Sequence, residues 1–170
     1  MTLVSTEVNT VKHVGTRRHL ANEEAGVRNS QVGDANEIQT HIEGLGAEFA
    51  FCKLFNVMVD LTTNIRSAKK GEDKGDAMLP NGMVVDVKTT HLDNGRLICA
   101  PWKDENNKMD LFCLMTGVFP TYTFRGFYRK DDLFQDINKI QLRNVCYGVT
   151  QRQLLTLEEV MALFNQAPIL

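Results

Sequence analysis

An acid and a base, Asp86 and Lys88, stand two residues apart in the otherwise apolar stretch NGMVVDVKTT. Side chains of a strand alternate between its two faces, so these two side chains share one face, roughly 7 Å apart along the strand. Such a pair on its own is also typical of the polar face of an edge strand. The residues before it favour chemistry, because they bring a second carboxylate, Asp76, close to the first.

The turn LPNGM predicts where Asp76 lies. Pro80 suits the first position of a type I turn, and Gly82 suits the left-handed position that follows in a three-residue hairpin loop. Counting back from this loop places Asp76 opposite Asp86, with Cβ atoms roughly 5 Å apart. Two carboxylates so placed repel each other unless something positive lies between them, and a divalent cation fits because hard cations take carboxylate oxygens. A slip of one residue would move Asp76 to the other face.

A third acid comes from a predicted helix over residues 41–55. At about 100° per residue, one broad arc of this helix is apolar, and it holds Ile42, Leu45, Phe49, Cys52 and Phe55. Glu48 lies inside that arc, where an acid needs a base or a metal as its partner. We therefore expect Glu48 to point at the hairpin. The alternative is a buried Glu48–Arg pair with no catalytic role. Thr40 and Glu43 are spaced as a capping box at the start of this helix.

The rest of the sequence predicts the frame that holds these residues. Strands are expected near residues 56–68, in a hairpin over 76–90, and over 96–102, 109–117 and 121–129. Helices are expected within 1–39 and over 41–55, 131–140 and 156–166, the last started by a capping box at Thr156 and Glu159. This order predicts an α/β protein with a central mixed β-sheet flanked by helices. An N-terminal helical segment over residues 1–39 would precede the core over 40–170, within a single domain overall.

Composition limits the classes of protein. The chain has 170 residues, of which 43% are hydrophobic and 24% charged, as in an ordinary globular protein. No apolar run approaches the ~20 residues that span a bilayer, and the first residues lack the order of a secretory signal, so we expect a cytoplasmic protein without membrane partners. The net charge is −2. Contact with nucleic acid must therefore come from a local patch, a metal ion or an oligomer.

The cysteines and histidines predict no metal site of their own. None of the four cysteines forms a C-x-x-C pair, and the four histidines are scattered. We expect reduced cysteines that act mostly as small hydrophobic residues; these are Cys52, Cys99, Cys113 and Cys146.

The segment GLGAEFAFCKLF followed by KGDAMLPNGMVVDVKTT resembles the PD-(D/E)xK nuclease superfamily, whose members have the restriction-endonuclease-like fold. The pattern of that family is an acid on a helix, an Asp at the start of a hairpin, and (D/E)-x-K on its second strand. The residues that match it in order are Glu48, Asp76, Asp86 and Lys88. Gly75 stands where the family pattern has Pro. The resemblance covers roughly residues 40–135. The strands and helix that follow the motif resemble those of several small phage and bacterial members of the superfamily.

The resemblance implies a phosphodiesterase that needs Mg²⁺ or Mn²⁺. Asp76, Asp86 and the backbone carbonyl of Val87 would hold the metal, and Glu48 would complete the site directly or through water. Lys88 would orient the attacking water or stabilise the charge of the transition state. The function expected from this resemblance is a metal-dependent endonuclease that acts on DNA in a bacterial or phage-infected cell.

Candidate contacts to nucleic acid lie before and after the hairpin and in the N-terminal segment: Arg66, Lys69, Lys70, Lys74, Thr89, Thr90, His91, Arg17 and Arg18. A solubilising loop and a solvated helix face are the alternatives for the basic residues among them. Two other functions stay open on the same fold. One is a structure-specific nuclease that cuts junctions or flaps, and the other is a catalytically silent nucleic-acid-binding or assembly protein. A homodimer is possible in each case.

Overall fold

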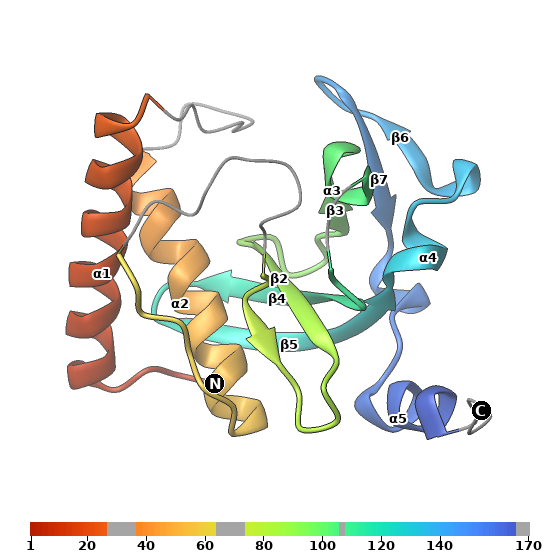
Figure 1. Cartoon of the computed structure of the whole chain (residues 1–170), viewed down its shortest axis with the longest axis horizontal. Coiled ribbons are helices and arrows are strands. Elements are labelled where there is room, and N and C mark those ends of the chain that lie inside the picture. The colour runs from red at the N-terminus through yellow and green to blue at the C-terminus, as the bar shows by residue number, and fades with distance from the viewer. Residues whose placement is uncertain (27–36, 64–73, 106–107, 166–170) are drawn as a thin grey trace.

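The computed structural model describes residues 1–26, 37–63, 74–105 and 108–165. Its elements form successive layers (Figure 1). Helix α1 (Ser5–Glu24) packs on helix α2 (Glu37–Phe55), and α2 covers one face of a four-stranded sheet. A three-stranded sheet lies beyond the other face. No described helix is long and apolar enough to cross a membrane.

The four-stranded sheet has the strand order β1-β2-β4-β5. Its strands are β1 (Ala77–Met78), β2 (Val84–Thr90), β4 (Leu111–Val118) and β5 (Thr121–Arg129). β2 runs parallel to β4, whereas the β1–β2 and β4–β5 pairs are antiparallel. The sheet is therefore mixed and flanked by helices, which confirms the predicted fold class.

The second sheet has the order β3-β7-β6, and all its pairs are antiparallel. Its strands are β3 (Leu97–Cys99), β7 (Val145–Val149) and β6 (Lys139–Gln141). The short helices are α3 (Trp102–Glu105), α4 (Lys130–Leu133) and α5 (Leu157–Asn165), with 3₁₀ turns η1 (Asp136–Asn138) and η2 (Gln151–Gln153). The β6–β7 hairpin was not predicted from the sequence, and the helix expected over residues 131–140 is wrong beyond its first turn.

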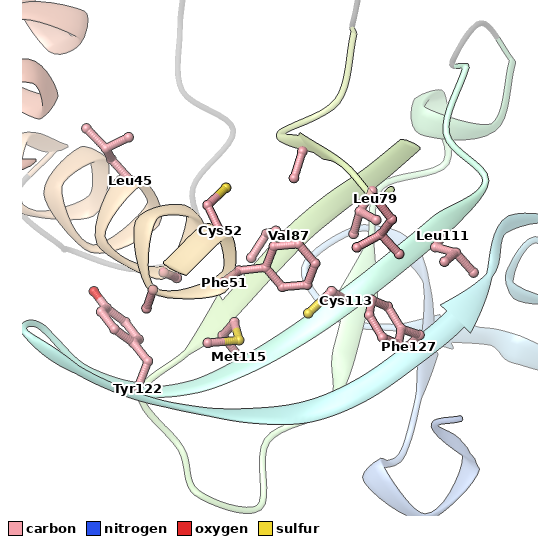
Figure 2. Packing of buried hydrophobic residues seen from close by; sticks show 14 of the residues in the cluster. Leu45, Phe51, Cys52, Leu79, Val87, Leu111, Cys113, Met115, Tyr122 and Phe127 are labelled. Carbon is pink, nitrogen blue, oxygen red and sulfur yellow. The ribbon is translucent and has the colours of Figure 1, made fainter. Parts of the chain in front are cut away.

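The main core lies between α2 and the four-stranded sheet (Figure 2). Phe51 of α2 is fully buried and faces Val87, Cys113 and Phe127 of the sheet. Val11 of α1 is also fully buried in this core, so α1 is part of the domain. The opposite face of the sheet packs a second core against the second sheet. Its buried members are Leu97, Cys99, Met109, Phe112, Leu114, Leu133 and Val149.

Two local expectations need correction. Helix α2 begins at Glu37, so Thr40 lies inside the helix and the capping box with Glu43 does not form its start. Residues 56–63, expected to enter a strand, form no strand. Two carbonyls of this segment, those of Asp60 and Thr62, accept hydrogen bonds from the side chain of Arg18.

The capping box at the start of α5 is confirmed. The Thr156 amide donates to Glu159 Oε2 at 2.7 Å, and the Glu159 amide donates to Thr156 Oγ1 at 3.2 Å. Each side chain therefore satisfies a backbone amide of the first turn, as the sequence pattern predicts.

Candidate active site

The hairpin of β1 and β2 forms with the predicted turn. Gly82 has a φ of 87°. Its amide donates to the Leu79 carbonyl at 2.9 Å, and the Leu79 amide donates to the Met83 carbonyl at 2.9 Å. The strands then pair in the predicted register, with Ala77 opposite Val85. Turn chemistry and strand alternation were sufficient to predict this part of the site.

Asp86 and Lys88 share one face of β2, as predicted. In the register of the sheet they lie beside Phe112 and Leu114 of β4, on the face of the second core. Asp86 is only 2% exposed. The ammonium group of Lys88 forms an ion pair with its carboxylate. The two side chains are therefore part of a buried charge cluster and not of a solvated strand face.

Lys103, which the sequence analysis did not predict, also belongs to this cluster. Its Nζ lies 2.6 Å from Asp86 Oδ1. It comes from α3, in the connection that leads from β2 to β4. No spacing rule links residues 86 and 103. The Lys103 ammonium also lies 5.1 Å from the ring centroid of the neighbouring Trp102, but this local contact does not indicate the one with Asp86. Only the path of the connection brings the second lysine to Asp86.

Electrostatics keep Asp86 and Lys88 charged at neutral pH. Burial by itself would raise the pKa of Asp86, but the charges of Lys88 and Lys103 outweigh it and hold that pKa below its ordinary value. Burial would lower the pKa of Lys88, but the Asp86 carboxylate outweighs it and the pKa is raised. Among the described residues, the Asp86 carboxylate thus faces two ammonium groups.

Asp76 lies beside β2 but does not continue the ladder as the partner of Asp86. Its amide donates to the Val85 carbonyl at 2.9 Å, and its Oδ2 accepts the Val87 amide at 2.8 Å. The predicted direct opposition is therefore not what the structure shows, because the chain bends at Gly75, whose φ is 76°. The N–H and C=O of a strand residue point to the same edge, so the Val87 carbonyl faces the Asp76 side.

Gly75 explains the one departure from the pattern of the resembled family. A Cβ atom there would lie 2.5 Å from Val84 Cγ1 and 2.8 Å from Met109 Sδ. Proline has a φ fixed near −65° and cannot adopt the positive φ of this residue. In this hairpin, glycine is therefore the residue that the backbone requires where the family pattern has Pro.

Glu48 forms the ion pair that was the alternative expectation. Its Oε2 lies 3.2 Å from Nη1 of Arg18. Both residues line a cavity of about 220 Å³ between α1 and α2. Glu48 and Asp76 of the hairpin both act on Cys52. Burial and the negative charges of these two acids raise the pKa of the Cys52 thiol to about 12. Glu48 and Asp76 therefore act on one region from the α2 side of the sheet.

The candidate contacts to nucleic acid fall into distinct groups. Thr89 and Thr90 line a cavity of about 570 Å³ together with Lys88. The side chain of Arg18 is directed inward to Glu48 and to backbone carbonyls. Three further candidates are exposed: Lys74, His91 and Arg17. Three lie outside the described residues: Arg66, Lys69 and Lys70.

The oxygen atoms near β2 fit a magnesium or manganese ion in part. Among the described residues, no three histidine, cysteine or acidic side chains gather in one place. Mg²⁺, however, keeps several waters and takes one or two carboxylates plus substrate phosphates. Asp76, Asp86 and the Val87 carbonyl are donors of that kind. Burial and these two carboxylates raise the pKa of Cys113, the residue paired with Val87, so both carboxylates act near this position.

Comparison with known proteins adds a family but no activity. The family model described as "Family of unknown function (DUF5843)" matches residues 1–125. This range contains all four residues of the predicted motif. No curated protein and no solved structure matches the chain.

Proposed function

The chain belongs to the DUF5843 family, and we propose that this member is a metal-dependent endonuclease that hydrolyses phosphodiester bonds in DNA. One observation carries the proposal. The buried Asp86–Lys88 pair on β2 has a second carboxylate, Asp76, hydrogen-bonded to the amide of the residue between them. Carboxylates, a carbonyl and an ammonium thus gather around three consecutive residues of one strand.

In this proposal Asp76 and Asp86, with the Val87 carbonyl, would hold Mg²⁺ or Mn²⁺. A metal bound there would supply Lewis acidity and lower the pKa of a bound water. Asp76 is already oriented by its hydrogen bond to the Val87 amide. Glu48 would act from the α2 side, and its pairing with Arg18 keeps its carboxylate in place.

Lys88 would donate to the phosphoryl group, where its ammonium stabilises developing negative charge. To accept a metal ion, Asp86 has to exchange one of its two ammonium partners. The side chain of Lys88 is 28% exposed and that of Lys103 is 12% exposed. Lys88 also lines the larger cavity. Lys88 is therefore the partner that can turn to substrate, while Lys103 continues to balance the charge of Asp86.

The test is cleavage of labelled duplex, single-strand, flap, junction and RNA substrates with Mg²⁺, with Mn²⁺ and with EDTA. We expect metal-dependent cleavage that Lys88→Met reduces about 100-fold or more. This variant keeps the Asp86–Lys103 pair. Asp76→Asn should have a similar effect, because the amide oxygen still accepts the Val87 N–H while the negative charge is lost.

Lys139→Met is the matched control, since Lys139 forms an exposed ion pair with Asp136 in η1. It should cleave as the parent does. Cleavage by Lys88→Met and Asp76→Asn at the parent's rate, after careful purification, would show that the site is assigned wrongly.

One observation favours a second function, a catalytically silent binding or assembly protein. Asp86 and Glu48 both already have cationic partners, as in purely structural ion pairs. Calorimetry with Mn²⁺ separates the two functions. No metal binding at millimolar concentration would favour the silent protein, whereas binding that Asp76→Asn weakens would favour the nuclease.

A further inference from the structure

The larger cavity lies between the end of β2 and the turn that leads to β3. Its volume of about 570 Å³ is in the range of small-ligand sites. Lys88 of the candidate active site forms part of its wall. The lining residues are Lys88, Thr89, Thr90, Leu92, Asn94, Gly95, Arg96 and Ile98.

The turn that forms one wall is held in place from outside. Gln151 Nε2 donates to the Asp93 carbonyl at 2.7 Å and to the Gly95 carbonyl at 3.0 Å. Arg125 forms an ion pair with the Asp93 carboxylate. The Gly95 amide closes the turn by donating to the Leu92 carbonyl at 2.9 Å. Such a wall is preorganised, so binding a ligand does not have to order it.

The charges at the cavity favour an anion. Arg96 has no ion pair within the described part of the chain. Asp93, the nearest acid in the turn, is already neutralised by Arg125. Lys88 shares the single carboxylate of Asp86 with Lys103. Within the described part of the chain, Arg96 is therefore a cation of this cavity that no acid pairs with, although the whole chain has a net charge of −2.

The cavity also has an apolar part. Leu92, which is 54% exposed, and Ile98, which is half-buried, both line the cavity. A ligand that combines a phosphate with a flat apolar ring matches both parts, and a nucleotide has this composition. Bases of unpaired nucleotides are commonly held against aromatic or apolar side chains, with the backbone on positive charge.

The combination of cations and an apolar wall favours a substrate with an unpaired strand. Proteins that hold a duplex neutralise many phosphates over a broad basic surface, whereas this cavity offers two cations, Arg96 and Lys88, beside an apolar wall. The faces of a base in a duplex are covered by the neighbouring bases, so only an unstacked base can lay its face against Leu92 and Ile98.

We propose that this cavity binds one nucleotide of a single-stranded nucleic acid next to the scissile phosphate. The phosphate lies on Arg96 and Lys88, and the base lies against Leu92 and Ile98. The inference rests on the proposed function and specifies its substrate class. It distinguishes an enzyme for unpaired ends or flaps from one for continuous duplex.

The test is fluorescence anisotropy in EDTA, so that no cleavage occurs. The probes are a short labelled DNA strand, the RNA of the same sequence and the blunt DNA duplex. We expect the single strand to bind more tightly than the duplex, and Arg96→Gln to weaken that binding about tenfold through loss of a charged hydrogen bond. The RNA probe shows which kind of strand is preferred.

Arg143→Gln is the matched control. Arg143 is exposed in the turn between β6 and β7, at the end of β7 away from the pairing of Leu97 with Val149. It should leave binding unchanged. Duplex binding as tight as that of the single strand, or unchanged binding by Arg96→Gln, would overturn the inference.

The inference and the proposed function fail in different ways. Single-strand binding that depends on Arg96, in a protein that cleaves nothing with any metal, supports the cavity and contradicts the endonuclease. Cleavage that depends on Lys88, in a protein whose Arg96→Gln variant binds as the parent does, supports the endonuclease and contradicts the cavity.

Discussion

Asp86 is the residue around which the candidate site is built. A buried ion pair carries a desolvation cost, which a second hydrogen-bonded partner helps to offset. Lys103 supplies that partner from α3, and its contact with Asp86 Oδ1 measures 2.6 Å. The charge of Asp86 is therefore needed by the fold as well as by the proposed chemistry. The two roles are separated by comparing stability with activity.

At this scale we predict that Asp86→Asn lowers the free energy of unfolding by about 3 kcal/mol, because the mostly buried ammonium groups of Lys103 and Lys88 lose their counter-charge. Since the pKa of Asp86 lies below its ordinary 3.8, its contribution is present above that pH and is lost as the pH falls through the lower, folded-state value. Urea denaturation at neutral pH measures the loss.

The control for this prediction is Asp136→Asn, which removes an exposed acid from an equivalent pair with lysine. The stability of that variant should equal the parent's, since surface pairs contribute little. Equal stability of the Asp86 and Asp136 variants would contradict a structural role for the buried cluster.

At the scale of elements, the β1–β2 hairpin positions the acids, and two glycines shape it. Gly82 lies in the turn with open space around the position of a Cβ atom. Gly75 lies before β1, and its missing Cβ is enclosed by Val84 and Met109. Both have positive φ angles, 87° and 76°. The first glycine is required by conformation, and the second by conformation and space.

We therefore predict that Gly75→Ala destabilises the protein more than Gly82→Ala. The turn variant should lose about 1 kcal/mol, the cost of a left-handed backbone for alanine. The Gly75 variant should lose about 3 kcal/mol, because overpacking adds to that cost. Chemical denaturation of the two variants side by side checks the order. Losses of equal size would show that the enclosure of Gly75 does not constrain the hairpin.

At the scale of the whole molecule, the four-stranded sheet is covered on both faces, and residues after 125 supply much of that cover. Phe127 is fully buried in the main core, and Leu133 and Val149 are buried in the second. β7 also pairs with β3, which follows the candidate site in the chain. The range matched by the family model ends inside β5, so it does not delimit a folding unit in this structure.

We predict that a chain ending at residue 125 lacks a cooperative thermal transition. It loses half of β5 and the whole β6–β7 hairpin, so both cores are exposed. A chain ending at residue 156 is the control. It lacks α5, which contributes Val160 to the main core, and should still unfold cooperatively at a lower temperature. Circular dichroism measures both, and a cooperative transition in the shorter chain would contradict the prediction.

The sequence by itself determined the features that depend on neighbouring residues. Strand alternation put Asp86 and Lys88 on one face, and the turn chemistry of Gly82 set the register of the hairpin. Helix periodicity placed Glu48 among buried residues and required a partner for it.

Only the tertiary structure decided which partners these residues have. Lys103 reaches Asp86 and Arg18 reaches Glu48 across 17 and 30 residues of chain, and β7 joins β3 across a longer separation. Such contacts depend on how the connections cross the sheet and on the burial that makes an unpaired charge costly. No local pattern in the sequence encodes the path of these connections or the burial of these charges.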